Sequence, residues 1–272
     1  TRTLPRQVQE TVLRELPLTQ IYEPRIDPIR TTMHKVDNLK ILCLNVDGDG
    51  KTRCHPTNAY MDRILTLQKP DIMAIIDGRF RHRPDFTIPN YSLTAWIPCD
   101  DTTQGVGGLI IYQRQGLQRT IYPGIQDTLG NTIWIKVIRQ NNKRLAIGFG
   151  YCRPRRERNR AQNDQFYDIM DQGIFKYKND TTDIIIMADW NARLGAKVGD
   201  TIKAGHHKRF MDFLDRHGLV SVNEYYAKGQ KTFDKRSNQG SASSIVDHAV
   251  AQEGLEYIKN MYVDPSEVYE TH

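Results

Sequence analysis

Residues 183–195 read Asp-Ile-Ile-Ile-Met-Ala-Asp-Trp-Asn-Ala-Arg-Leu-Gly. The apolar run from Ile184 to Ala188 is strand-sized and has no polar alternation, which is typical of a strand buried on both faces. Asp189 and Asn191 follow at the point where the run stops. The stretch therefore predicts a buried strand over 183–189 that delivers polar side chains to one edge of a sheet.

Polar residues recur where other predicted strands stop. Asn45 ends the apolar stretch 39–46, and Asp77 follows the stretch 71–76. Tyr151 closes the stretch 144–151, and Asp247 lies within the stretch 244–251. Each of these alone has a structural explanation, as a turn residue, a helix cap or a surface strand residue. Together at one sheet edge, carboxylates and amides suit metal-assisted phosphodiester hydrolysis, because a hard cation needs oxygen ligands and the attacking water needs a base.

The remaining pattern predicts a sandwich. Further strands are expected over 91–97, 107–113, 131–139, 219–223 and 257–263, and the stretches 131–139 and 144–151 form a predicted hairpin. Helices are expected after residue 57, around 166–177 and around 210–217. Because the helices are interleaved with hairpins and do not alternate strictly with strands, we expect an α/β fold of two packed mixed β-sheets flanked by helices, in four layers α/β/β/α.

The N-terminal part of the chain differs from the rest in its proline content. Residues 1–38 hold four of the twelve prolines, so we expect an N-terminal arm or linker there, with one short helix around Arg6 to Leu16, and one domain over 39–272. The chain starts with Thr1 and shows no signal-peptide pattern, which predicts a piece of a longer, intracellular protein.

No apolar run is long enough to span a membrane. The four cysteines are scattered and fit free thiols in a reducing compartment.

The positive charge is concentrated. Lys and Arg number 38 against 32 Asp and Glu, a net charge of +6, and hydrophobic residues make up 39%, which excludes disorder along the whole chain. Basic residues cluster within 153–160, within 79–83 and within 203–209. Each cluster lies near a candidate catalytic residue, so we expect a polyanionic partner, duplex DNA, bound mainly through its phosphates.

In this order, five segments resemble the endonuclease/exonuclease/phosphatase superfamily: 41–45, 71–77, 150–154, 187–195 and 244–247. The Asp-Trp-Asn-Ala-Arg-Leu-Gly segment is most similar to the apurinic-type endonuclease domain of non-LTR (LINE-like) retrotransposons. So are the strand 107–112, the pair Thr232-Phe233 and the stretch 217–223.

The resemblance implies a role for each candidate. Asn45 and Asp77 would hold Mg²⁺, with Mn²⁺ as an alternative. Asp189 would align or deprotonate the attacking water, while Asn191 and Tyr151 would donate to the phosphate. Asp247 would orient a histidine at the C-terminal end of the domain, where this chain has His272. The implied nucleic-acid contacts are Arg79, Arg153, Arg155, Arg156, Arg158, Thr232 and Phe233.

Three departures from the family pattern bear on activity. Asp77 stands where the family usually has Glu, one methylene longer. The terminal Ser-Asp-His pattern reads Glu270-Thr271-His272, with Thr271 in place of the middle carboxylate. The chain also ends where the family continues into another core strand.

We therefore expect a Mg²⁺-dependent endonuclease that nicks DNA within a retroelement polyprotein, with RNA and a reverse transcriptase domain as further partners, in the nucleus or a ribonucleoprotein particle. The alternative is a catalytically degenerate domain of the same fold that binds nucleic acid or protein. A third option keeps the fold but changes the substrate. The basic loops argue against a lipid or phosphoinositide and leave RNA open.

Overall fold

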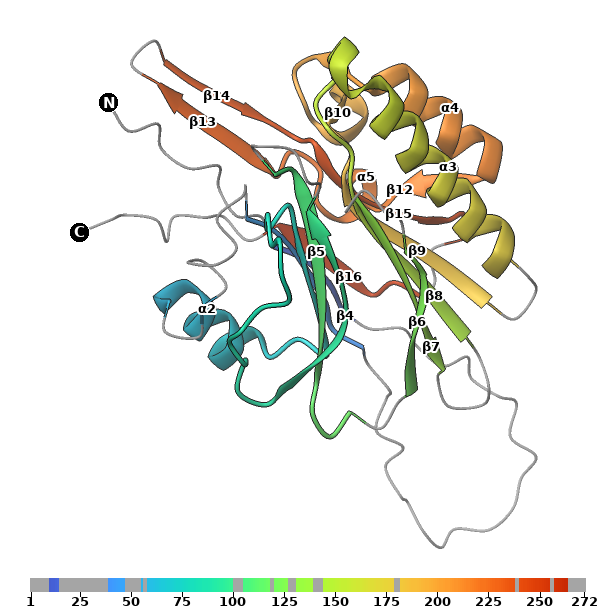
Figure 1. Cartoon of the computed structure of the whole chain (residues 1–272). Coiled ribbons are helices and arrows are strands. Elements are labelled where there is room, and N and C mark those ends of the chain that lie inside the picture. Colours follow the sequence, from blue (N-terminus) through green and yellow to red (C-terminus); the bar gives the residue numbers. More distant parts are fainter. Residues whose placement is uncertain are drawn as a thin grey trace, which may run out of the picture.

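Two six-stranded mixed sheets lie face to face at the centre of the molecule, as the predicted architecture requires (Figure 1). The computed structural model describes residues 10–14, 39–46, 55, 58–99, 105–117, 120–126, 131–138, 144–178, 182–237, 240–254 and 257–263. The first sheet has the order β16-β1-β2-β3-β5-β4 and the second the order β12-β15-β9-β8-β7-β6.

The strands of the first sheet are β1 (Glu10–Arg14), β2 (Ile41–Asn45), β3 (Ile72–Ile76), β4 (Tyr91–Cys99), β5 (Gly107–Arg114) and β16 (Asn260–Val263). Those of the second are β6 (Thr120–Gln126), β7 (Thr132–Ile138), β8 (Arg144–Tyr151), β9 (Thr182–Asp189), β12 (Leu219–Ser221) and β15 (Asp247–Gln252). Two small ribbons pair β10 (Ala192–Leu194) with β11 (Lys203–Gly205) and β13 (Phe233–Ser237) with β14 (Gly240–Ser244).

Helices form the outer layers. Helix α2 (Ala59–Arg63), continued by a π-helical turn η1 (Ile64–Gln68), packs on the outer face of the first sheet through Met61 and Ile64. Helices α3 (Arg160–Tyr177) and α4 (His207–His217) cover the outer face of the second sheet (Figure 1). The short helix α5 (Val222–Tyr226) follows β12. None of the described helices is both long and apolar enough to cross a bilayer.

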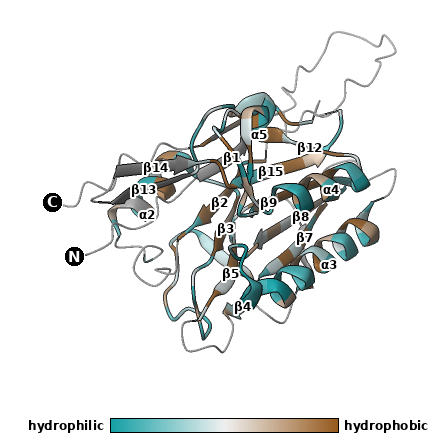
Figure 2. Ribbon diagram, turned by 90° about the horizontal axis from the view of Figure 1, so that it is seen from above, coloured by the Kyte–Doolittle hydropathy of each residue, from teal (hydrophilic) through white to brown (hydrophobic). Residues whose placement is uncertain are grey.

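Alternation along β7 shows why the sheets stack. Ile133, Ile135 and Val137 belong to the core between the sheets, whereas Trp134 belongs to the core under α3 and α4. Successive strand residues point to opposite faces, so a strand covered on both sides needs apolar residues at nearly every position. Figure 2 shows this as hydrophobic colouring along the strands, with mixed colouring on α3 and α4.

Two parallel pairs set the direction of the site. Strands β2 and β3 run parallel and are connected through α2, and β8 and β9 run parallel and are connected through α3. A parallel pair needs a crossover, which places a helix on the sheet face. The carboxyl ends of all four strands carry the polar residues that the sequence singled out.

The structure corrects three local predictions. The helix expected around Arg6 to Leu16 is wrong for residues 10–14, which form β1 and pair with β2 and β16 on either side. These long-range ladders satisfy the main chain on both edges and override local propensity. The strand expected over 219–223 ends at Ser221, and Val222 and Asn223 begin α5. The strand expected over 244–251 starts at Asp247, with Ser244 ending β14.

In the described part of the chain, Cys43, Cys99 and Cys152 are buried free thiols.

Candidate active site

Asp189, the last residue of β9, lies at the centre of the candidate site. Its side chain is fully buried, and both carboxylate oxygens accept hydrogen bonds. Oδ2 accepts from Nδ2 of Asn45 at 2.9 Å, and Oδ1 accepts from the backbone N–H of Asn191 at 2.9 Å. Asn45 belongs to the first sheet and Asp189 to the second, so this carboxylate joins the two sheets of the sandwich.

The register of the second sheet places two more candidates beside Asp189. Tyr151 is the partner of Asp189 in the parallel β8–β9 ladder, and Asp247 is its partner in the antiparallel β9–β15 ladder. Neighbouring strands lie about 4.8 Å apart. Both side chains are buried, with 4% of Tyr151 and 8% of Asp247 exposed. Three adjacent strands therefore bring a phenol and two carboxylates to one edge.

Asn45 reaches the site because of strand alternation. Ile41 and Cys43 of β2 face the core between the sheets, and Asn45 continues that face at the end of the strand. It lines a small cavity between the sheets together with Cys43 and Asp247. Burial raises the pKa of the Cys43 thiol well above its usual value, and the negative charges of Asp247 and Asp189 raise it further. Both carboxylates thus act on the same space between the sheets.

The turn after Asp189 is fixed on several sides. Asn191 has a left-handed backbone conformation (φ 46°), which Asn tolerates better than most residues. Its Nδ2 donates to the carbonyl oxygen of Cys152 at 2.7 Å, and its own carbonyl accepts from the backbone N–H of His206 at 3.1 Å. Trp190, which lies between Asp189 and Asn191 in the chain, is fully buried and stacks on Phe210 with 4.4 Å between ring centroids. This geometry holds Asn191 in one position relative to Asp189 and leaves the second N–H of its amide for another acceptor.

Asp247 is positioned by residues that the sequence did not assign to that task. The hydroxyl oxygen of Thr232 accepts from the backbone N–H groups of Val246 and Asp247, at 2.9 and 3.0 Å. Nδ2 of Asn223 donates to the carbonyl oxygen of Asp247 at 3.1 Å. Thr232 is only 1% exposed, so its observed contacts are with the strand that carries Asp247. Its role in binding nucleic acid stays a prediction.

Asp77 lies at the corresponding end of the first sheet. It follows β3, is fully buried and has a left-handed backbone (φ 51°), and its Oδ1 accepts from the backbone N–H of Gly107 at 3.0 Å. In the parallel β2–β3 ladder, Asn45 pairs with Ile76, the residue before Asp77. Asn45 and Asp77 therefore stand at the same sheet edge.

The oxygen atoms of Asn45 and Asp77 can be compared with the ligands that a divalent cation needs. Within the described residues, no three His, Cys, Asp or Glu side chains gather into a ligand cluster. What remains is an amide oxygen and a carboxylate on adjacent strands, Asn45 and Asp77. Mg²⁺ keeps several waters and binds through one or two carboxylates together with substrate phosphate. The residues present fit such a site and do not fit a cage made wholly of protein ligands.

His248, the residue after Asp247, lies under the turn. It is completely buried, and its Nε2 donates to the carbonyl oxygen of Ala192 at 2.9 Å. Burial lowers the pKa of His248 to about 4. The imidazole is therefore neutral at pH 7 and supports the segment that follows Asn191.

The residues predicted to contact nucleic acid differ in how exposed their side chains are. Arg79, Arg155, Arg156 and Arg158 are exposed, whereas Arg153 is buried with 5% exposed. The backbone of Phe233 begins β13, and its side chain lies outside the described part of the structure, as do Glu270, Thr271 and His272 entirely. The roles predicted for these residues stay predictions.

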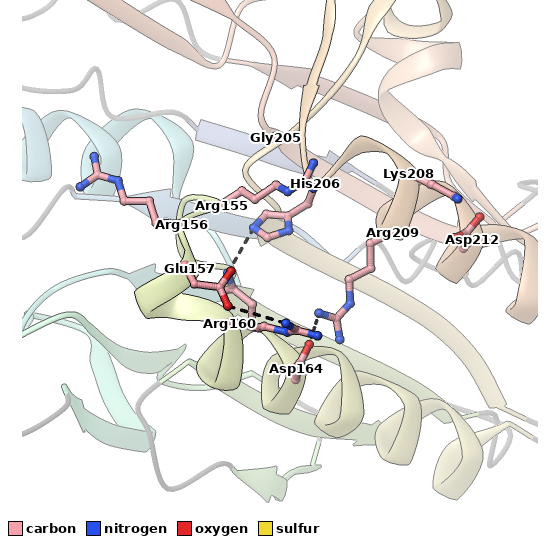
Figure 3. A pocket seen from close by; sticks show the side chains of 11 residues that line it. Arg155, Arg156, Glu157, Arg160, Asp164, Gly205, His206, Lys208, Arg209 and Asp212 are labelled. Carbon is pink, nitrogen blue, oxygen red and sulfur yellow. Dashed lines mark hydrogen bonds and ion pairs between the residues drawn. The ribbon is translucent and has the colours of Figure 1, made fainter.

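Two of the basic clusters meet in space. A groove of about 650 Å³ lies between the start of α3 and the start of α4. Its lining residues, drawn in Figure 3, are Arg155, Arg156, Glu157, Arg160, Asn163, Asp164, Gly205, His206, Lys208, Arg209 and Asp212. We call it the α3–α4 groove. Two of the three basic clusters, those within 153–160 and 203–209, therefore line one groove although they lie some 50 residues apart in the chain.

Comparison with known proteins supports the fold. No protein-family model and no curated protein matches the chain by sequence. Solved structures do match, and the chain has the endonuclease/exonuclease/phosphatase fold. The predicted fold class and the predicted resemblance are confirmed at that level.

The similar structures include the endonuclease domain of TRAS1, a telomere-specific non-LTR retrotransposon, with a TM-score of 0.57, 15% identity, and coverage of 79% of this chain and 85% of that chain. An AP endonuclease from Archaeoglobus fulgidus has a TM-score of 0.56 and 14% identity, over 80% of this chain and 88% of its own. The 3′ phosphatase NExo from Neisseria, bound to product DNA hairpin, has a TM-score of 0.54 and 13% identity, over 80% and 88%. At these identities the likeness shows the fold alone.

Proposed function

We propose that this chain is a divalent-metal-dependent phosphodiester hydrolase that nicks DNA. The observation that carries the proposal is the Asp189 carboxylate, held at 2.9 Å by Asn45 from one sheet and at 2.9 Å by the Asn191 backbone from the turn. A buried carboxylate fixed by two donors and flanked by Tyr151 and Asp247 is costly to build for structure alone. Such a preorganised polar group suits catalysis.

Each side chain then has a task. Asp189 accepts a hydrogen bond from the attacking water and aligns or deprotonates it. The remaining amide N–H of Asn191 and the hydroxyl of Tyr151 donate to the scissile phosphate. Asp247 orients a histidine, for which His272 is the candidate, and a carboxylate behind an imidazole fixes its tautomer.

The cation site consists of Asn45 and Asp77. A bound Mg²⁺, or Mn²⁺ as the alternative, would supply Lewis-acid stabilisation of the negative charge on the phosphate. Asp77 is one carbon shorter than Glu, and its Oδ1 also accepts from Gly107 N–H. Asn45 donates to Asp189 through its nitrogen, so its amide oxygen is the atom suited to the cation.

The biological setting is a further part of the proposal. The resemblance of residues 187–195 to non-LTR retrotransposon endonucleases and the structural likeness to the TRAS1 domain support a target-site endonuclease within a retroelement polyprotein. Its partners would be duplex DNA, the element's RNA and a reverse transcriptase domain, in the nucleus or a ribonucleoprotein particle. We also propose one catalytic domain over 39–272 to which residues 10–14 add β1, with the rest of 1–38 as an arm or linker.

A plasmid assay tests the activity. The purified chain should convert supercoiled plasmid DNA to the nicked circle with MgCl₂ present, and EDTA should stop the conversion. A labelled RNA of matched length in the same buffer distinguishes an RNase. If neither nucleic acid is cut in Mg²⁺ or Mn²⁺, the active-enzyme proposal fails and the degenerate binding module takes its place.

A further inference from the structure

The loop between β10 and β11 carries an aspartate, Asp200, whose side chain is completely buried. Its Oδ2 accepts a hydrogen bond from Nε of Arg193 at 2.9 Å, and its Oδ1 accepts from a terminal nitrogen of the same guanidinium at 2.6 Å. Two parallel N–H···O bonds fix the relative orientation of a guanidinium and a carboxylate, whereas a single bond leaves it free. Asp200 therefore holds Arg193, and with it β10, in one geometry.

The Asp200 carboxylate is ionised at pH 7 in spite of its burial. Burial raises its pKa, but hydrogen bonds from the Arg193 side chain and from the backbone N–H groups of Ile245 and Thr201 outweigh burial and lower the pKa to about 2. Nζ of Lys231 lies 3.6 Å from Oδ1 and adds a second positive charge. A buried charge needs such partners because its removal from water is costly. The contact with Arg193 is therefore an ion pair at neutral pH.

One side of this ion pair leads to the turn after β9. Arg193 stands two residues after Asn191 and pairs with Ala204 in the β10–β11 ladder. Two residues beyond Ala204, the backbone N–H of His206 donates to the Asn191 carbonyl at 3.1 Å. The anchor on Arg193 thus fixes the ribbon, and the ribbon fixes the backbone of Asn191.

The other side of the ion pair leads to the start of β15. The oxygen Oδ2 of Asp200 that accepts from the guanidinium also accepts from the backbone N–H of Ile245 at 3.1 Å. Ile245 lies in the two-residue connection from β14 to β15 and stands two residues before Asp247. In the same connection, the Val246 carbonyl accepts from the backbone N–H of Trp190 at 3.0 Å. One buried carboxylate therefore links the turn after β9 to the segment that enters β15.

We propose that Arg193 and Asp200 are positioning residues that fix Asn191 and Asp247 relative to each other. Both act through main-chain segments and touch no reacting atom. The catalytic roles of Asn191 and Asp247 rest on the proposed function, whereas the coupling of the two segments does not. A displacement of about 1 Å at a reacting group can slow a reaction about a hundredfold. Loosening this anchor should therefore slow nicking and leave DNA binding intact.

Single-turnover nicking of supercoiled plasmid, at saturating protein and MgCl₂, tests the positioning. Arg193→Gln removes the charge and one arm of the fork, and it should slow nicking about 10- to 100-fold. Arg193→Lys keeps the charge but replaces the fork by a single donor group, so it should slow nicking about three- to tenfold. The affinity of both variants for a short fluorescent duplex in EDTA should stay within about twofold of the parent, because the pair touches no phosphate.

Arg114→Gln is the matched control for the loss of an ion pair with a buried aspartate. Arg114 pairs with Asp71, whose side chain is 7% exposed, through Nε at 3.1 Å and through a terminal nitrogen. Asp71 precedes β3 and Asp77 follows it, so the control pair lies about 20 Å from Asp77 at 3.3 Å per residue. Both Arg→Gln variants should lower the midpoint of chemical denaturation. Only Arg193→Gln should slow nicking, and Arg114→Gln should stay within about twofold of the parent.

Amide hydrogen exchange supplies a measurement that needs no activity. In Arg193→Gln, exchange should accelerate in residues 189–193 and in residues 244–248 together, because both segments lose the same anchor. In Arg114→Gln, exchange in these two segments should match the parent. Acceleration in 189–193 alone would show that the pair holds its own ribbon and couples nothing, which would overturn the proposal.

Three kinetic outcomes would also overturn it: nicking by Arg193→Lys at the parent rate, nicking by Arg193→Gln no slower than by Arg114→Gln, or a loss of duplex affinity that parallels the loss of rate. If Arg193→Gln does not fold, Arg193→Lys serves for both the kinetic and the exchange measurements. A parent chain that cuts no DNA would refute the proposed function, and the exchange data would then decide the coupling of the two segments.

Discussion

The turns after β9 and after β3 look alike locally and differ in what holds them. Each follows a strand that is buried where it meets the turn, and each carries an aspartate and a left-handed residue that is not glycine, Asn191 at φ 46° and Asp77 at φ 51°. Asp189 is held from the opposite sheet by Asn45, whereas the Asp77 contact with Gly107 stays within one sheet. We therefore propose that the geometry of the turn that joins the sheets sets the reaction and that the other turn supplies a cation ligand.

The largest expected effect follows from breaking the turn after β9. Asp189→Ala and Asn191→Ala should each abolish nicking of supercoiled DNA, by about a thousandfold or more, because the water loses its acceptor and the phosphate loses a donor. Duplex binding by both variants should be retained. Loss of binding in parallel with nicking would show that these residues hold the fold or the DNA and not the reaction.

Glycine 205 offers a way to displace the same turn without touching a reacting group. A Cβ on Gly205 would lie 2.0 Å from the carbonyl oxygen of Asn191, and its backbone is left-handed (φ 66°). Gly205→Ala should lower the free energy of unfolding by about 3 kcal/mol or more and reduce nicking with it. Gly116→Ala is the control, because Gly116 is also left-handed (φ 76°) but has no atom within 4 Å of a built Cβ. It should cost only about 1 to 2 kcal/mol in chemical denaturation. If the two variants lost the same free energy of unfolding, the contact between residue 205 and the Asn191 carbonyl would not explain the loss.

Acid should weaken the support beneath this turn. Burial lowers the pKa of His248 from 6.5 to about 4, so between those values the unfolded chain binds a proton that the folded chain does not. Stability is then fully present above pH 6.5 and falls as the pH falls, by about 3 kcal/mol at pH 4 from this group. The lowered pKa of His206 acts in the same direction. His248→Gln should flatten the pH dependence of unfolding over this window, and an unchanged curve would contradict the role given to His248.

The smallest effect is expected at the turn after β3. Asp77→Glu restores the family's side-chain length and should preserve nicking or raise it, by less than about tenfold, because a cation site recruits water or phosphate oxygens. The side chain is fully buried, so the added methylene should cost about 1 to 3 kcal/mol of stability. Nicking rates of the two proteins at a series of Mg²⁺ concentrations check this. A loss as large as that of Asp189→Ala would place Asp77 at the centre of the reaction.

Local pattern predicted most of the fold. The apolar run of β9, the alternation of Ile133, Trp134 and Ile135 in β7 and the helix α3 all have a period that one sheet or helix face imposes. β1 was missed because its pairing with β2 and β16 is a long-range event. β10 and β11 were missed because strands of three residues show no period.

The candidate site was predictable in its residues and not in its contacts. Asn45 and Asp189 both stand at strand ends, yet the hydrogen bond between them joins positions 144 apart in the chain. The support of Asp247 by Thr232 and the link from His206 to Asn191 depend equally on how loops pack. Residue type marks the candidates, and only the packing of two sheets shows which of them meet.

One side-by-side measurement tests the central claim most directly. The single-turnover rate of plasmid nicking at saturating protein and MgCl₂ should be compared for the parent, Asp189→Asn and Asp77→Asn, since each change keeps the side-chain shape and removes one charge. We expect Asp189→Asn to slow nicking by about a thousandfold and Asp77→Asn to slow it by no more than about tenfold, with rescue of the latter by higher Mg²⁺. Equal losses, or a greater loss for Asp77→Asn, would contradict the assignment of the reaction to the turn that joins the sheets.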